Sequence, residues 1–135
     1  MKTIPSYISA EKVQENSDMT VLVRLLKEAY LNKIDCIDVP QRTSIVRPGH
    51  FTAFDIMPAY SEDDKLFITK IGAVIPKEGI NQVSVNTSLV AFSAESGEII
   101  GIFDGDAITK LKCAAVTALV TDYCSDPNAK VLGLV

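Results

Sequence analysis

The sequence of 135 residues contains no tryptophan and only one histidine. It also lacks a basic excess, because 13 lysines and arginines stand against 17 acidic residues and give a formal net charge of −4. That balance leaves no electrostatic footprint for nucleic acid or for an anionic membrane surface, and we expect neither as a partner. No stretch approaches the roughly 18–20 apolar residues that a transmembrane helix requires.

The scarcity of cysteine and histidine limits redox and metal chemistry. Cys36, Cys113 and Cys124 show no C-x-x-C spacing, and three thiols cannot all pair with one another. This favours a reducing compartment, and we expect a cytoplasmic protein. A zinc site would have His50 as its only histidine ligand, so we expect no metal. His50 itself lies in "RPGHFT", which is typical of a loop.

What is present fits one folded domain: 47% of the residues are hydrophobic and 22% are charged. Ser9 and Asp18 each precede a run that is compatible with a helix, and both residue types cap helices well. After Asp18, apolar residues repeat at helical spacing from Val21 to Tyr30. The pattern predicts an amphipathic helix of about four turns.

The middle of the chain is typical of β-strands. Between residues 39 and 94, four segments are rich in β-branched and aromatic residues and are separated by turn-like sequences: "TSIVR", "FTAFDIMPAY", "LFITKIGAVI" and "VSVNTSLVAFS". The links are short, so we expect mostly antiparallel pairing. A hairpin at Ser96-Gly97 would then add a further strand over 98–103.

The last third predicts one long helix and a final strand. The helix should open near Asp106 or Thr109 and stop at Pro127, since proline cannot continue a helix. Asp104 and Asp106 in "FDGDAIT" suit a turn followed by a helix cap. The closing "AKVLGLV" predicts a strand over 129–135.

Taken together, the order of elements predicts an α+β domain. We expect a mixed, mostly antiparallel sheet with helices packed on one face. The strand over 129–135 does not obviously belong to that sheet.

Three basic residues lie in strand-like or helix-start settings and are candidates for a site. Lys70 has apolar neighbours in "LFITKIGAV", where a charge is costly unless it is paired; alternatively it is an edge-strand lysine in water. Arg42, in "VPQRTSIV", could be an ordinary surface arginine, and Lys112 could be a solvated helix residue. If the three converge, they form a cationic pocket for a carboxylate or a phosphate. Cys113, next to Lys112, is either a thiol beside a cation or a small packing residue.

A family resemblance adds to these observations. The segments "VPQRT", "MPAY", "TK" and "SGEIIGIFDGDAITKLKCAAVTAL", followed by "VLGLV", occur in the order and spacing of the ornithine cyclodeaminase/mu-crystallin family. The resemblance covers essentially the whole chain. It implies that residues 1–128 form the N-terminal part of a substrate-binding and dimerisation domain. It also implies that 129–135 is the first strand of an NAD(P)-binding Rossmann domain that lies mostly beyond this chain.

The same resemblance implies roles for particular residues. Arg42 matches the arginine that holds the substrate carboxylate, and Lys70 matches a catalytic lysine that contacts the substrate near the reacting carbon. Ser84 matches a hydroxyl residue that reaches the cofactor, which would be NAD or NADP. Lys112 and Cys113 stand where the family commonly has Arg-Thr, beside both substrate and cofactor. Lysine keeps the charge there but loses the guanidinium fork.

The function implied is that of an ornithine cyclodeaminase-like enzyme acting on an amino acid or an imine, as a homodimer. A hydride leaves the α-carbon, a nucleophile attacks the resulting imine, and ammonia departs. The catalytic aspartate and the phosphate-binding glycines of the family lie beyond residue 135, so this chain alone is not expected to complete the chemistry. Two alternatives stay open: a ketimine reductase or amino-acid dehydrogenase of the same family, and a non-catalytic dimerising or ligand-binding module.

Overall fold

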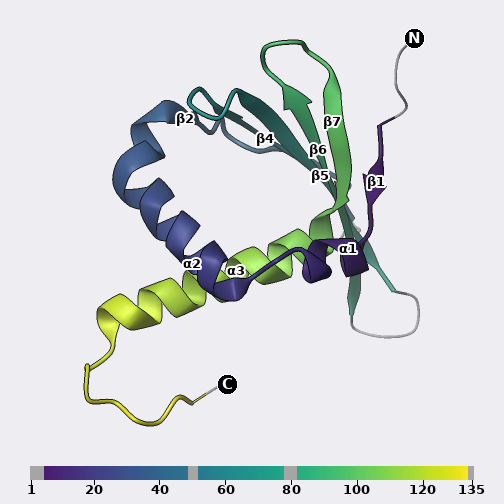
Figure 1. The fold of residues 1–135 in the computed structure, drawn as a ribbon. Coiled ribbons are helices and arrows are strands. Elements are labelled where there is room, and N and C mark those ends of the chain that lie inside the picture. Colours follow the sequence, from purple (N-terminus) through teal and green to yellow (C-terminus); the bar gives the residue numbers. More distant parts are fainter. Residues whose placement is uncertain (1–4, 49–51, 78–81, 134–135) are drawn as a thin grey trace.

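The chain folds around one mixed sheet (Figure 1). The computed structural model describes residues 5–48, 52–77 and 82–133, so His50 lies outside the described residues. The sheet has seven strands in the order β1-β7-β6-β5-β4-β2, and β3 also pairs with β4. Only β1 and β7 run parallel among the described pairs. The strands are β1 (Tyr7–Ile8), β2 (Ile37–Asp38), β3 (Thr43–Val46), β4 (Ala53–Ser61), β5 (Leu66–Pro76), β6 (Val83–Ser93) and β7 (Ile99–Asp104).

Three α-helices accompany the sheet among the described residues: α1 (Ala10–Glu15), α2 (Met19–Glu28) and α3 (Gly105–Cys124). Helix α3 packs against β6 and β7, α1 against β7, and α2 against α3. A π-helical turn (Ala29–Lys33) and a 3-10 turn (Ile34–Cys36) continue α2 towards β2, as the arc in Figure 1 shows. The predicted α+β fold, with a mostly antiparallel sheet and helices on one face, is confirmed.

Aspartates fix the starts of both longer helices. Asp18 accepts a hydrogen bond from the amide of Val21 at 3.0 Å. Asp104 accepts one from the amide of Ala107 at 2.8 Å, so the predicted turn and cap in "FDGDAIT" are confirmed. Each bond satisfies an amide that has no partner within the helix. Helix α3 begins at Gly105, one residue before the first expected start.

The two faces of the sheet differ in what covers them. We call the face that carries Lys70, Leu89 and Ala91 the helix face, because α3 packs there. We call the face that carries Ile56 and Ile71 the open face. The buried hydrophobic side chains among the described residues are few and come from α1, β6 and α3: Val13, Ala91, Ala107, Ala115 and Leu119. Much of the remaining apolar surface is therefore exposed.

The strand predicted over 129–135 is not formed across residues 129–133, which carry neither helix nor strand. Val131 and Leu132 are 90% and 72% exposed. A strand needs a neighbour for its backbone hydrogen bonds, and no described strand lies beside this segment. Residues 134 and 135 lie outside the described residues, and the assignment of 129–135 to a further domain stays a prediction. No helix in the described part of the chain is long and apolar enough to cross a membrane.

Candidate functional site

Lys70 lies in the middle of the sheet, so its interpretation as an edge-strand lysine is wrong. Its strand, β5, runs between β4 and β6. The half-buried Lys70 side chain donates from Nζ to Oγ1 of Thr109 at 3.2 Å, and Thr109 Oγ1 donates in turn to the carbonyl of Gly105 at 2.6 Å. This chain of hydrogen bonds holds an ammonium group beside the first turns of α3. Only one of its three N–H donors has a partner among the described residues.

Arg42 is brought to the same face as Lys70. Arg42 precedes β3 by one residue, and its Nη1 lies 3.8 Å from Oδ2 of Asp55. Asp55 pairs with Gly72, which is two residues from Lys70 along β5 and therefore on the same face. Arg42 thus reaches the helix face beside Asp55, in the row next to that of Lys70. Side chains of this length can converge on one small ligand between them.

The structure adds an acidic residue that the sequence analysis missed. Asp55 Oδ2 lies 3.8 Å from Nη1 of Arg42, and Asp55 Oδ1 accepts a hydrogen bond from Ser44 Oγ at 2.5 Å. The Asp55 side chain is 15% exposed and that of Arg42 is 60% exposed. A signal was present, because Asp55 interrupts the apolar run "FTAFDIM", where a charge needs a partner.

A second pair that was not predicted joins the sheet to α3. Asp55 pairs with Gly72, and Gly72 pairs with Thr87, so the three occupy one row across the helix face. Thr87 Oγ1 donates to Asp106 Oδ1 at 2.5 Å. The approach is close: a Cβ atom on Gly105 would lie 2.6 Å from Thr87 Oγ1. Glycine is therefore required where α3 leaves the sheet.

The predicted cofactor residues separate into two groups. Lys112 and Cys113 are exposed on α3, one turn beyond Thr109 and on its side of the helix. Ser84 pairs with Ile75, five residues along β5 from Lys70, so its side chain is on the open face. The structure does not bring Ser84 together with Lys70. Thr87, a hydroxyl residue of β6 that pairs with Gly72, does share the helix face with Lys70.

The described residues do not provide a pyrophosphate site for a nicotinamide dinucleotide. Such a site usually uses the free amides at a helix N-terminus after a glycine-rich turn. At α3 the Asp104 carboxylate already accepts from the Ala107 amide, and Asp106 adds a second negative charge in the first turn. A phosphate would be repelled there. The cofactor contacts predicted at Lys112 and Cys113 lie further along α3 and stay a prediction.

Metal chemistry finds no support in this part of the chain. Within residues 5–48, 52–77 and 82–133, no three histidine, cysteine or acidic side chains come together as a group that could hold a metal ion.

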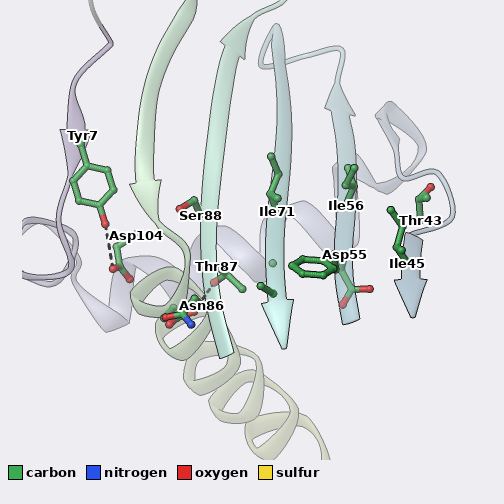
Figure 2. Close-up of a pocket in the computed structure, with 14 residues that line it drawn as sticks. Tyr7, Thr43, Ile45, Asp55, Ile56, Ile71, Asn86, Thr87, Ser88 and Asp104 are labelled. Carbon is green, nitrogen blue, oxygen red and sulfur yellow. Dashed lines mark hydrogen bonds between the residues drawn. The ribbon is translucent and has the colours of Figure 1, made fainter. Parts of the chain in front are cut away.

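A separate cavity of about 590 Å³ lies mainly against the open face (Figure 2). At its rim, the Tyr7 hydroxyl donates to Asp104 Oδ2 at 3.4 Å. Partial desolvation and the Asp104 carboxylate raise the pKa of Tyr7, so the phenol stays a neutral donor. Neither Arg42 nor Lys70 lines this cavity, but the helix-face residues Asp55, Gly72 and Thr87 do, so the cavity also borders that face. Its lining residues include Thr43, Ile45, Phe54, Ile56, Ile71, Ala73, Asn86 and Ser88.

Solved structures share this fold and define its class. The chain is similar to the structure of Thermococcus litoralis Delta(1)-pyrroline-2-carboxylate reductase in complex with NADH and L-proline. The match covers 93% of this chain and 39% of the other, with a TM-score of 0.79 and 23% identity. The chain is also similar to an archaeal alanine dehydrogenase dimer with bound NAD. That match covers 92% of this chain and 38% of the other, with a TM-score of 0.76 and 18% identity. The fold is thus the α+β domain that these two structures contain.

The family follows from the sequence itself. The family model described as the ornithine cyclodeaminase/mu-crystallin family matches residues 5–135, and the chain belongs to that family. The mouse ketimine reductase mu-crystallin is 31% identical over 140 residues, which cover 98% of this chain. The chain spans 44% of the length of that relative. The resemblance stated from the motifs is confirmed.

Proposed function

We propose that this chain supplies the carboxylate-binding wall of an NAD(P)-dependent enzyme that interconverts an amino acid and an imine. The observation that carries the proposal is the placement of Arg42 beside Asp55, in the row next to that of Lys70 on one face of the sheet. Arginine can bind a carboxylate through two parallel hydrogen bonds, and lysine adds a point charge. Names of relatives and solved neighbours, which refer to imine reductases and NAD, support the same chemistry.

The chain's residues would bind and orient the substrate, while the nicotinamide supplies or accepts the hydride. Arg42 would hold the carboxylate. The two unpaired N–H donors of Lys70 would face the reacting carbon and stabilise charge that develops beside it. Lys112 and Cys113 would border the cofactor side. For the cofactor-facing hydroxyl we favour Thr87 over Ser84, because Thr87 shares the helix face with Lys70.

Two reactions fit this arrangement. In an ornithine cyclodeaminase-like reaction, a hydride would pass from the α-carbon to the nicotinamide, an amine would attack the imine, ammonia would depart, and the hydride would return to the cyclic imine carbon. In ketimine reduction, a hydride adds to the imine carbon and a proton adds to its nitrogen. The ketimine reductase relative favours the second reaction. The three free cysteines support a reducing, cytoplasmic compartment for either enzyme.

Titration of the chain with L-proline, followed by NMR, tests the proposal. We expect saturable binding, and we expect Arg42→Ala to weaken it about tenfold, because a charge-assisted pair of hydrogen bonds is lost. Arg47→Ala is the matched control, since Arg47 is an exposed arginine four residues beyond β3's first residue. Equal binding by the Arg42 variant would show that the pocket is assigned wrongly. No binding by the unsubstituted chain would favour the non-catalytic dimerising module.

The proposal includes a homodimer formed through the open face of the sheet. Ile45, Phe54, Ile56 and Ile71 are exposed together on that face, over the cavity of Figure 2. Monomers rarely expose a contiguous apolar surface of this kind. A second copy could cover it through a two-fold interface, in which the same patch serves both subunits. The related archaeal structure is described as a dimer.

Replacing Ile71 with glutamate should convert the dimer to a monomer. Burying a carboxylate in an apolar interface costs several kcal/mol unless the charge is paired. Light scattering coupled to size-exclusion chromatography would report the mass of both forms. Val131→Glu adds the same charge at a 90% exposed position away from the sheet and should leave the mass unchanged. A monomeric unsubstituted chain at micromolar concentration would contradict the dimer.

A further inference from the structure

The helix face carries a carboxylate whose partners are incomplete. Asp55 Oδ1 is engaged by Ser44, but the contact that Oδ2 makes with Arg42 Nη1 is 3.8 Å long. A charge-assisted hydrogen bond of this type is about 2.7–2.9 Å. The Asp55 side chain is 15% exposed, so its carboxylate is partly screened from water and gains from a close cationic donor. Arg42 and Asp55 are therefore neighbouring opposite charges that are not joined by a close hydrogen bond.

We infer that Asp55 accepts the positively charged nitrogen of the ligand whose carboxylate Arg42 holds. This inference rests on the proposed carboxylate-binding role of Arg42. In an α-amino acid the two charges are separated by a single carbon, and a ligand of that form can bridge the Arg42–Asp55 gap with each charge on its opposite. A cyclic iminium carboxylate has the same charge pattern. The pair thus selects zwitterions over simple carboxylates.

Position on the sheet supports this role. Asp55 pairs with Gly72 in the row next to that of Met57 and Lys70, so its carboxylate and the Lys70 ammonium share the helix face. Two cations without an acid would favour any anion, including a keto acid or a phosphate. One half-buried acid beside them lowers that attraction and adds an acceptor for a cationic nitrogen. Ser44 holds Asp55 Oδ1, which leaves Oδ2 directed at the Arg42 side.

A simpler role for Asp55 is to position Arg42 without touching the ligand. The two roles differ in what loss of the charge does. If Asp55 only positions Arg42, loss of its charge would weaken the binding of every carboxylate ligand alike. If Asp55 instead binds the ligand nitrogen, loss of its charge would weaken the binding of only those ligands that carry such a nitrogen.

A matched pair of ligands separates the two roles. L-proline carries both charges, whereas tetrahydrofuran-2-carboxylate has the same ring with oxygen in place of nitrogen. We expect the unsubstituted chain to bind L-proline about tenfold more tightly. Asp55→Asn should weaken L-proline binding about tenfold and leave the oxygen analogue unchanged or slightly tighter, so the selectivity falls to about one.

Two further variants complete the experiment. Ser44→Ala keeps the Asp55 charge and should keep the selectivity, and Glu98→Gln removes an exposed charge at the opposite end of the sheet and should change nothing. Equal losses for both ligands in Asp55→Asn would overturn the inference, as would no loss for either. If Arg42→Ala still weakens both ligands in those cases, the proposed function stands and only the role of Asp55 fails. If Arg42→Ala weakens neither, both fail.

Discussion

Replacing Gly105 with alanine should lower the melting temperature of the chain by roughly 5–10 °C, because it forces apart two elements that touch at this residue. An added Cβ would lie 2.6 Å from Thr87 Oγ1 and 2.8 Å from the carbonyl carbon of Thr87. Side chains can rotate away, but a backbone atom of a central strand cannot. Helix α3 would have to move off β6, which breaks the Thr87–Asp106 hydrogen bond and shifts Thr109 away from Lys70.

Two comparisons by calorimetry sharpen this expectation. Gly133→Ala is the control, since no atom lies within 4 Å of a Cβ built there, and its melting temperature should not change. Combining Gly105→Ala with Thr87→Ala should restore only part of the loss, because the close contact with the Thr87 backbone remains. An unchanged melting temperature for Gly105→Ala alone would show that the helix start is not tightly packed.

Local pattern was enough to predict the strong elements of the fold. The predicted strand segment "VSVNTSLVAFS" is β6 as the structure has it, because a long β-branched run has few other ways to bury its side chains. The aspartate caps of α2 and α3 were equally local signals. The two-residue strands β1 and β2 were missed, since their existence depends on partners far along the chain rather than on their own composition.

The candidate site shows where sequence reasoning stops. Within one strand the alternation of faces can be counted from the sequence, and Lys70 does share its face with Ile68. Lys70 and Ser84 lie on different strands, β5 and β6, and the pairing register rather than the residue count decides which face Ser84 takes. Asp55 was visible as an acid in an apolar run, but its contact with Arg42 depends on the pairing of β3 with β4.

Replacing Lys70 with methionine should reduce L-proline binding by one to two orders of magnitude, since a half-buried ammonium with two free donors is lost from the helix face. The same change should leave the melting temperature unchanged or raise it. Methionine is flexible, has a similar length and needs no hydrogen bond in this setting. Thr109 keeps its hydrogen bond to the Gly105 carbonyl, so no buried polar group is left without a partner by the change.

This opposite response of binding and stability separates a functional lysine from a structural one. Replacing a residue that stabilises the fold lowers the melting temperature. Replacing a residue that serves the chemistry but destabilises the fold leaves the melting temperature unchanged or raises it. Lys110→Met, at an exposed position one residue from Thr109 on α3, should alter neither quantity. Should Lys70→Met instead melt earlier and bind L-proline normally, Lys70 would be a packing residue of the β5–α3 contact. Arg42 would then be left to hold the carboxylate alone.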